Sequence, residues 1–377
     1  MQPKVCLITF SNLVSDGRSL NALRAISSVS NVVCFSLTSD KEFQELLLPK
    51  SVKHFPVIVP KKRLLLNWHF FINYVKDIFS SFNQFGKYIF WACDLYSLGA
   101  VYKIARKSDY VIYDSREIYS ALANLSKSPI KQKILTFLEK KWVNIVNHFV
   151  VSGELDAEYL KEYFKTQKMF TTIYNVPPYK EYVETNIIKE RYPFLKDYVI
   201  LLYQGAVHYG RGISPVLDFI ASSKKYAFVV LGNGIFLNEA KIIAQNKGIL
   251  DRVVFAGNIP YEDLHQWTCS ADIGMNLIEP ISLSYKFALP NKLFEYAMAG
   301  LPQVVSSLPA LEKIINQYHI GVIVNDFTPN SILNAIEKII DNYKYYRQNC
   351  LKFAKNNNYD IEEQKIQKIM QIIMNNI

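Results

Sequence analysis

The feature that most limits how this chain can fold is an alternation of short apolar runs with helical patterns, which recurs through both halves. In the first half the strand-like runs are Val5–Phe10, Val32–Leu37, Tyr88–Ala92, Tyr110–Tyr113 and His148–Val151. In the second half they are Tyr198–Gln204, Ala227–Gly232, Val253–Gly257, Asp272–Leu277, Gln303–Ser306 and Gly321–Val324. Segments with helical spacing, such as Leu237–Lys247 and Asn330–Asp341, lie between or after them. Strands that alternate with helices indicate parallel sheets, so the sequence predicts an α/β protein built from doubly wound, Rossmann-like domains.

The length of the chain indicates two domains. Its 377 residues exceed the roughly 250–300 that one hydrophobic core supports. Prolines and charged residues interrupt the pattern from Asn175 to Pro193, which places the boundary there. We expect an N-terminal domain over residues 1–185, a C-terminal domain over residues 186–355, and a final helix within residues 356–377. The pattern alone leaves open which domain this helix, about Ile361–Met374, packs against.

Composition narrows the class of protein. Uncharged, mainly apolar runs such as Leu64–Val75 are shorter than the roughly 20 residues that cross a bilayer. The apolar stretch after Lys4, about six residues, is shorter than the core of a secretory signal. Five scattered cysteines without paired spacing, and six histidines without metal-ligand spacing, favour neither a disulfide framework nor a metal site. We therefore expect a reduced, cytoplasmic protein that requires no metal or other cofactor.

The charge of the chain is unevenly distributed. Of the net +10, residues 1–190 carry +8, from 25 Lys and Arg against 17 Asp and Glu, and residues 191–377 carry +2, from 18 against 16. A basic half suits an anionic partner, which could be nucleic acid, an acidic membrane surface or a phosphorylated substrate. An ordinary solvated, lysine-rich surface fits as well. Nucleic acid ranks last, because the basic residues form no aromatic-interleaved platform and no recognised module.

The most informative segment runs from Ser282 to Ser306. Pro290 sets the first turn of a predicted helix over Asn291–Ala299, which Gly300 and Pro302 end before the next strand. A helix N-terminus at the carboxyl edge of a parallel sheet offers N–H groups and a positive dipole to an anion, and Lys292 adds a full charge. Glu295, about one turn further, could accept hydrogen bonds from the hydroxyls of a ribose. The alternative is an ordinary capped helix with an exposed Lys and Glu.

A glycine-rich loop follows the first strand of the second half. It holds Gly205, Gly210 and Gly212 together with Arg211, whose guanidinium matches phosphate oxygens. Glycine-rich turns are common in such domains, so the loop alone is a weak indication of a phosphate site. Together with the helix that begins at Asn291 the indication is stronger. The run Leu231-Gly-Asn-Gly234 lacks the third glycine of a dinucleotide fingerprint, which disfavours a nicotinamide site.

Charged residues also follow the strands of the N-terminal half. They are Asp16, Arg18, Asp94, Asp114, Arg116 and Glu117. The carboxyl ends of parallel strands are where α/β sheets bind substrates, so these residues could reach one cleft. The competing interpretation is that the aspartates cap loops and helices.

A basic and aromatic segment precedes the third strand of this half. Lys61, Lys62 and Arg63 lead into a run over residues 64–82 with apolar residues at helical spacing. Cations beside Trp68, Phe70 and Phe71 could hold such a helix at an anionic membrane surface. A second basic segment, Lys127–Lys141, adds to that hypothesis. The alternative is a core-facing crossover helix.

Taken together, these segments make the chain resemble the retaining glycosyltransferases of family 4, also called group 1, over nearly its full length. The resemblance is carried by Asp16-Gly-Arg18, Tyr113-Asp-Ser-Arg-Glu117, Leu202-Tyr-Gln-Gly205 with Gly210-Arg-Gly212, Gly248-Ile-Leu-Asp-Arg-Val-Val-Phe-Ala-Gly257 and Leu289-Pro-Asn-Lys-Leu-Phe-Glu-Tyr296. It implies the GT-B fold, in which two Rossmann-like domains face each other across a cleft and the terminal helix crosses back to the N-terminal domain. It also implies a metal-independent enzyme that moves a sugar with retention from a UDP- or GDP-sugar to a lipid-linked or nascent cell-surface polysaccharide, at the inner face of the cell membrane.

The resemblance also assigns roles to residues. The donor site implied is Gly205, Arg211, Lys286, Asn291, Lys292, Leu293 and Glu295. The catalytic residues implied are Arg211, Lys292 and Asp114, and the acceptor side comprises Asp16, Arg18, Asp94, Arg116 and Glu117.

Two positions depart from the family pattern. Phe287 stands where its first paired glutamate is expected, so Glu279, Tyr285 or a backbone N–H would have to replace that group. Leu217 stands where a lysine is usual, and Lys286 or Lys292 could supply its charge. The departures motivate a second hypothesis, a catalytically degenerate GT-B chain that acts as a binding or partner subunit. A nucleotide-sugar 2-epimerase has the same fold but needs an acid/base set that the sequence does not show.

Overall fold

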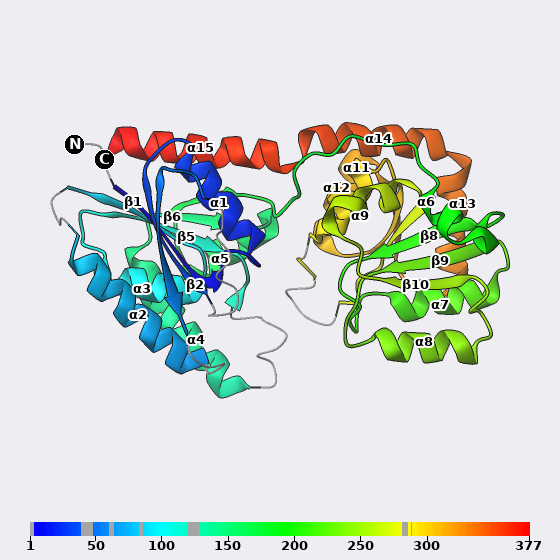
Figure 1. Ribbon diagram of the computed structural model, residues 1–377, viewed down its shortest axis with the longest axis horizontal. Helices are drawn as coiled ribbons and strands as arrows, with labels where there is room; N and C mark the ends of the chain where they lie inside the picture. The colour runs from blue at the N-terminus through cyan, green and yellow to red at the C-terminus, as the bar shows by residue number, and fades with distance from the viewer. Residues whose placement is uncertain are drawn as a thin grey trace. The chain divides into compact units, whose positions relative to one another are not determined.

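The computed structural model describes residues 4–38, 48–59, 64–82, 86–119, 128–280, 286–287 and 289–377. The chain forms two compact units (Figure 1). Residues 1–175 and 360–377 make up the N-terminal unit, and residues 176–359 make up the C-terminal unit. The boundaries predicted from the sequence are 185/186 and 355/356.

The N-terminal unit contains a seven-stranded parallel sheet. Its order is β3-β2-β1-β4-β5-β6-β7. The strands are β1 Lys4–Asn12, β2 Val32–Thr38, β3 Val52–Ile58, β4 Tyr88–Ala92, β5 Tyr110–Ser115, β6 His148–Val151 and β7 Met169–Thr172. Every strand predicted for this half is present, but β3 and β7 were not predicted. Both are edge strands, where one side of the ladder needs no partner, so β3 tolerates Lys53 and Pro56.

Helices cover both faces of this sheet because its side chains alternate between them. Cys6 and Ile8 of β1 face a core shared with α2 Leu64–Ser80, α3 Leu95–Ile104 and α4 Pro129–Trp142. Val5 and Leu7 face a core shared with α1 Gly17–Ser27 and α15 Tyr359–Asn376. The remaining helical elements are α5 Glu154–Phe164 and a short 3₁₀ turn, η3 Val143–Ile145.

The terminal helix α15 packs on the N-terminal unit beside α1 (Figure 1). Ile366, Ile369, Met370 and Ile373 form its buried face. At its start, the buried carboxylate of Glu362 accepts a hydrogen bond from the backbone N–H of Tyr174 (3.1 Å). The pattern of the sequence had left the partner of this helix open.

Helix α2 shows which of its aromatic residues can meet solvent. Phe71 and Val75 are fully buried, and the indole of Trp68 donates a hydrogen bond to the Tyr96 carbonyl (3.0 Å). Phe71 therefore follows the alternative, core-facing interpretation and cannot contact a membrane, because its face of the helix covers the sheet. Phe70 is 48% exposed. Lys61, Lys62 and Arg63 lie outside the described residues.

A buried carboxyl group lies under α4. Glu139 is 1% exposed and accepts a hydrogen bond from the Tyr113 hydroxyl (2.9 Å). Burial raises the pKa of Glu139 to about 7, against an ordinary value of 4.5, although the bond from Tyr113 opposes the rise.

The stability of the N-terminal unit should therefore depend on pH through Glu139. Because the folded state holds the proton more tightly, the stabilisation is complete below pH 4.5 and is lost as the pH rises to 7. Relative to Glu139→Gln, we expect the wild-type free energy of unfolding to fall by about 2–3 kcal/mol over that interval. Urea unfolding followed by tryptophan fluorescence, which reports this unit through Trp68, Trp91 and Trp142, measures it. Parallel pH curves for the two proteins would contradict the assignment.

The C-terminal unit contains a six-stranded parallel sheet of order β10-β9-β8-β11-β12-β13. The strands are β8 Val199–Gln204, β9 Tyr226–Leu231, β10 Val253–Gly257, β11 Ile273–Asn276, β12 Gln303–Ser306 and β13 Gly321–Val324, all at predicted places. The helical elements are α6 Ile187–Arg191, η4 Pro193–Leu195, α7 Ile213–Ser222, α8 Leu237–Asn246, α9 Tyr261–Cys269, α11 Asn291–Met298, α12 Pro309–Tyr318, α13 Pro329–Asp341 and α14 Tyr343–Asn356. Helices α7, α8 and α13 cover one face, and α6, α9 and α11 cover the other.

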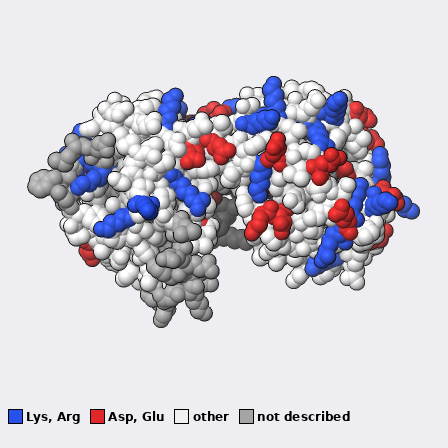
Figure 2. Space-filling view, turned by 45° about the horizontal axis from the view of Figure 1, so that its top comes forward, with Lys and Arg blue, Asp and Glu red and all other residues white. Residues whose placement is uncertain are grey.

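The surface charges also differ between the units. On the face shown in Figure 2, acidic and basic side chains intermingle over the C-terminal unit, whereas much of the N-terminal unit is uncharged. Within the described part of the chain, no helix combines the length and the apolar character needed to span a membrane.

Candidate functional site

The strand order of the C-terminal unit creates a switch point between β8 and β11. The chain leaves β8 toward β9 on one side, while β11 pairs with β8 on the other. In open α/β sheets the crevice at such a point, outside the carboxyl ends of the strands, is where ligands bind. The loop with Arg211 follows β8, and α11 follows β11 along the chain. The two motifs that the sequence singled out are thus brought together here.

Lys292 is the most unusual side chain at this point. It lies in the first turn of α11 and is 7% exposed, yet its Nζ has no hydrogen-bond partner among the described residues. The ammonium lies 3.6 Å from the centroid of the Tyr203 ring. Burial, reinforced by the charge of Arg211, lowers the pKa of Lys292 well below its ordinary value, although Glu295 opposes the change. Such a group is unfavourable unless an anion binds beside it.

Glycines let the surrounding loops come close to one another. Gly212 has a φ of +73°, and a Cβ there would lie 2.3 Å from the Leu277 carbonyl oxygen at the end of β11. The carbonyl of Gly210 in the same loop accepts a hydrogen bond from the backbone N–H of Glu279 (3.0 Å). The loop that carries Arg211 is therefore held against the chain leaving β11.

Glu295 lies one turn after Lys292 and is held by an amide. Gln204 at the end of β8 donates from Nε2 to the Glu295 carboxylate (2.6 Å), and its Oε1 accepts a hydrogen bond from Thr268 of α9 (2.7 Å). Burial raises the pKa of Glu295, while the bond from Gln204 and the charge of Lys292 lower it in part. Gln204 and Thr268 were not predicted, because their hydrogen bonds form only where β8, α9 and α11 meet in the fold.

Tyr296 fixes α11 to the same strand. Its hydroxyl donates to the Leu202 carbonyl (3.1 Å) and accepts from the Gln204 N–H (3.1 Å), and its ring is fully buried. Only glycine fits opposite the ring at Gly274, where a Cβ would lie 2.4 Å from it. These contacts set the position of the helix that bears Lys292 and Glu295.

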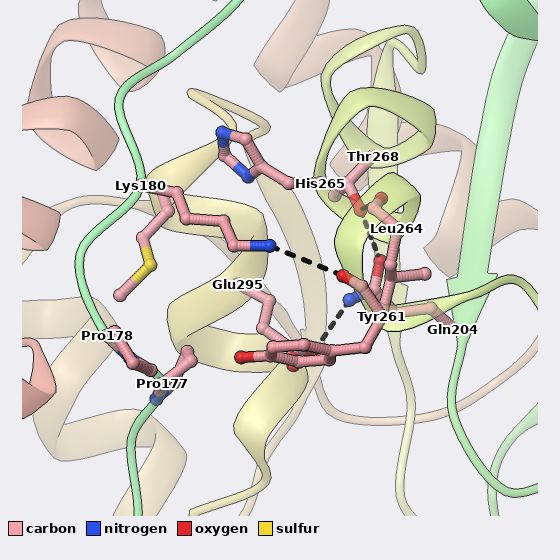
Figure 3. Close-up of a pocket in the computed structure, with 10 residues that line it drawn as sticks. Pro177, Pro178, Lys180, Gln204, Tyr261, Leu264, His265, Thr268 and Glu295 are labelled. Carbon is pink, nitrogen blue, oxygen red and sulfur yellow. Dashed lines mark hydrogen bonds between the residues drawn. The ribbon is translucent and has the colours of Figure 1, made fainter.

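A small pocket opens beside Glu295 (Figure 3). Pro177, Pro178, Lys180, Gln204, Tyr261, Leu264, His265, Thr268, Glu295 and Met298 line it. Lys180 crosses it, donating to the Tyr261 carbonyl (3.3 Å) above the Tyr261 ring. Its cavity volume of about 20 Å³ suits one water rather than a nucleoside. A bound nucleoside would therefore lie outside this pocket or widen it.

The other predicted donor residues differ in exposure. Lys286 and Asn291 are exposed, and Phe287 is half-buried. Leu293 is fully buried, and its backbone N–H donates to the Pro290 carbonyl (2.9 Å). Tyr285 lies outside the described residues.

In the N-terminal unit the predicted acceptor-side residues form paired charges. Arg18 contacts Asp114 (Nη2 to Oδ1, 2.7 Å) and also donates to the Ile173 carbonyl (2.8 Å). Arg116 contacts Asp16 (2.6 Å) and lies 3.6 Å from Asp114. Burial raises the pKa of Asp16, but Arg116 and hydrogen bonds from two serines outweigh it and bring the pKa to about 2.

Two of these aspartates also cap helices, as the alternative interpretation holds. Asp16 accepts from the Ser19 N–H at the start of α1. Asp94 accepts from the Ser97 N–H at the start of α3 (2.7 Å) and from the Phe10 N–H (3.0 Å). Glu117 is exposed. The described residues contain no group of three or more His, Cys, Asp or Glu side chains that could hold a metal ion.

Comparisons with known proteins bear on these two units. A family model described as glycosyl transferases group 1 matches residues 184–357. Two relatives from Methanocaldococcus jannaschii are described as uncharacterized glycosyltransferases. MJ1069 is 22% identical over 66% of this chain and 65% of its own length. MJ1607 is 24% identical over 44% of this chain and 41% of its own length. The chain thus matches less than two thirds of either relative.

Solved structures resemble the whole chain. Sucrose-phosphate synthase from Thermosynechococcus elongatus has a TM-score of 0.76 at 14% identity, covering 100% of both chains. Anabaena Alr3699/HepE in complex with UDP and glucose has a TM-score of 0.74 at 13% identity, and the match covers 98% of this chain and 99% of that one. WaaG, a glycosyltransferase involved in lipopolysaccharide biosynthesis, has a TM-score of 0.66 at 14% identity, and the match covers 97% of this chain and 99% of that one. The predicted α/β fold of GT-B type is confirmed. Residues 184–357 thus match the family model of the group 1 glycosyltransferases, and the chain has a fold of the GT-B type over its length.

Proposed function

We propose that this protein is a glycosyltransferase that moves a sugar from a nucleotide-sugar donor to a saccharide acceptor. The observation that carries the proposal is Lys292, whose buried Nζ has no hydrogen-bond partner in the part of the chain that the structure describes. It lies at a helix N-terminus, at the switch point of a sheet. The positive end of α11, this ammonium and the nearby charge of Arg211 suit a diphosphate. Glu295 is placed one turn further to accept hydrogen bonds from ribose hydroxyls.

The chemistry proposed is displacement of a nucleoside diphosphate. The bond between the anomeric carbon and the phosphate oxygen breaks, and a bond from that carbon to the acceptor oxygen forms on the same face, with retention. The hydroxyl proton of the acceptor passes to the departing diphosphate. Arg211 and Lys292 stabilise the charge that grows on the leaving group, so the proposal requires no metal ion and no protein nucleophile. Asp114 forms an ion pair with Arg18 and positions that guanidinium on the acceptor side. The catalytic role predicted for Asp114 stays a prediction.

The proposed donor is a UDP- or GDP-sugar. Anabaena HepE, whose fold is similar, has been solved in complex with UDP-glucose, which supports testing UDP-sugars first. The proposed acceptor is a lipid-linked or nascent cell-surface polysaccharide, received by the charged carboxyl edge of the N-terminal sheet at the inner face of a membrane. The involvement of WaaG in lipopolysaccharide biosynthesis supports that choice.

A nucleoside diphosphate should bind the C-terminal unit through Arg211. We expect Arg211→Ala to weaken the binding of UDP or GDP by about 1.5–3 kcal/mol, because a charge-assisted hydrogen bond is lost. Isothermal titration calorimetry measures it. Lys247→Ala, which removes a surface ion pair with Asp218, is the matched control and should bind like the wild type. If neither nucleotide binds the wild type, or if Arg211→Ala binds equally well, the site is assigned wrongly.

The second candidate function is a degenerate GT-B subunit that binds nucleotide sugars without transferring them. Phe287, at the position where the family pattern has a glutamate, favours it. A screen of UDP- and GDP-sugars that follows nucleotide release, with membrane extract as the source of acceptors, separates the two. Turnover with any donor supports the enzyme, and tight binding without turnover supports the subunit.

A further inference from the structure

A wide cavity opens at the amino edge of the N-terminal sheet, and the proposed chemistry does not use it. Strands β1, β2, β3 and β4 all begin at this edge, and their first residues line the cavity. Helix α15 ends beside them (Figure 1), where its Met374 also lines the cavity. The cavity volume, about 900 Å³, is in the range of sites for small molecules. The predicted acceptor-side residues follow the opposite, carboxyl ends of the strands.

Hydrogen bonds hold the walls of this cavity in place. The backbone N–H of Val32 donates to the Ser51 carbonyl (2.8 Å), and the Ser51 hydroxyl donates to the Ser27 carbonyl at the end of α1 (2.9 Å). The backbone N–H of Lys4 donates to the Lys87 carbonyl (3.0 Å). The turn before β3 and the start of β1 are thus fixed to their neighbours, so the cavity is formed before any ligand binds.

The charges that line the cavity are positive. Its cations are Lys4, Lys50 and Lys53, and none of its described lining residues is acidic. The ammonium of Lys53 lies 5.2 Å from the centroid of the Phe55 ring and 5.8 Å from that of Phe82. The ammonium of Lys4 lies 5.4 Å from the centroid of the Tyr88 ring. Cation–π contacts at these distances favour positions of both ammonium groups beside the cavity, where they attract an anion.

The uncharged lining suits hydroxyl groups. Ser30 and Ser81 donate their hydroxyl protons to backbone carbonyls, as Ser51 does, so the serine oxygens can still accept hydrogen bonds. Asn31 is exposed at the same edge and can donate as well as accept. The half-buried ring of Phe82 adds an apolar surface on which the C–H face of a sugar can pack.

We propose that this cavity binds an anionic sugar. The phosphate or carboxylate of the ligand contacts Lys50 and Lys53, its hydroxyls meet the serines and Asn31, and its ring covers Phe82. The ligand is either a free sugar phosphate or an acidic unit of a saccharide chain, since both have this chemistry. The alternative is that the lysines only offset the negative ends of α1 and α15. The inference does not rest on the proposed transfer reaction, because the cavity contains none of its residues.

Isothermal titration calorimetry of the full chain tests the proposal with glucose 6-phosphate and with tetragalacturonate. At least one should bind, more tightly than glucose, maltotetraose or inorganic phosphate, and its binding should weaken as salt is added. Lys50→Gln with Lys53→Gln should weaken it by roughly tenfold or more, because charge-assisted hydrogen bonds are lost. Lys224→Gln with Lys241→Gln removes two exposed charges from the C-terminal unit and should change nothing. The tighter of the two probes identifies the source of the ligand.

The Arg211→Ala variant separates this site from the proposed donor site. Binding of the anionic probe should persist in Arg211→Ala, and UDP binding should persist in the double lysine variant, which also shows that this variant is folded. Binding of the probe that is lost in Arg211→Ala and kept in the double lysine variant would assign it to the donor site and overturn the proposal. Binding of neither probe, or equal binding of inorganic phosphate, overturns it too. Binding of the probe in a protein that binds neither UDP nor GDP would contradict the proposed function and leave the cavity assigned.

Discussion

Replacing Lys292 by methionine should lower kcat/KM for sugar transfer by a factor of about 10²–10³, because a preorganised charge at the leaving group is removed. The same substitution should raise the free energy of unfolding. Lys292 is buried without a hydrogen-bond partner among the described residues, and methionine fills a similar volume without a polar atom. Kinetics of nucleotide release and urea unfolding measure the two effects. A lower kcat/KM together with a higher free energy of unfolding is expected only if Lys292 serves function rather than stability.

The pH dependence refines this expectation. Burial lowers the pKa of Lys292 in the folded state, so the unfolded chain holds that proton more tightly than the folded chain does. The stability advantage of Lys292→Met should shrink as the pH rises toward 10.5, where the unfolded lysine also becomes neutral. Lys247→Met, at an exposed ion pair, serves as the control and should alter neither quantity appreciably. Unchanged kcat/KM in Lys292→Met would remove the central residue of the proposed donor site.

Replacing Arg18 by methionine should destabilise the N-terminal unit by about 3–5 kcal/mol. The substitution leaves Asp114, 1% exposed, without its closest cation, and it removes the hydrogen bond to the Ile173 carbonyl. Arg116 compensates only weakly, since its Nε lies 3.6 Å from Asp114. Urea unfolding followed by tryptophan fluorescence measures the loss.

A double-mutant cycle tests the cause. In the Arg18→Met background, Asp114→Asn should restore part of the lost stability, because no uncompensated carboxylate remains buried. In the wild-type background the same substitution should destabilise. Additive effects of the two substitutions would show that the ion pair does not couple them. A rise in KM for the acceptor in Asp114→Asn, measured at a temperature where the variant is still folded, would separate positioning from a purely structural role.

The strands that could be predicted from the sequence are those that are buried on both faces. Central strands such as β4 and β8 are continuous apolar runs, because helices cover both of their faces. The edge strands β3 and β7 carry Lys53, Pro56 or threonines and gave no such signal. In α2, helical spacing could not separate Phe70 from Phe71, because apolar residues occur on both sides of this helix. Only packing against the sheet distinguishes them.

The candidate site was predictable where local chemistry defines it. A proline before a helix with Lys292 and Glu295 in its first turns, and a glycine loop with Arg211, can be read along the chain. Gln204 and Thr268 could not be found this way, since they act through hydrogen bonds between β8, α9 and α11. The pairing of Arg18 with Asp114, 96 residues apart, is likewise a product of the tertiary fold.

The placement of α15 has a consequence for how the protein is made on the ribosome. This helix follows the entire C-terminal unit along the chain, yet its isoleucines and Met370 cover a face of the N-terminal sheet. During translation that face must stay open while the intervening unit is synthesised and folds. The nascent N-terminal unit therefore exposes an apolar layer beside β1 and α1 throughout this period, and exposed apolar surface of this kind is what chaperones protect.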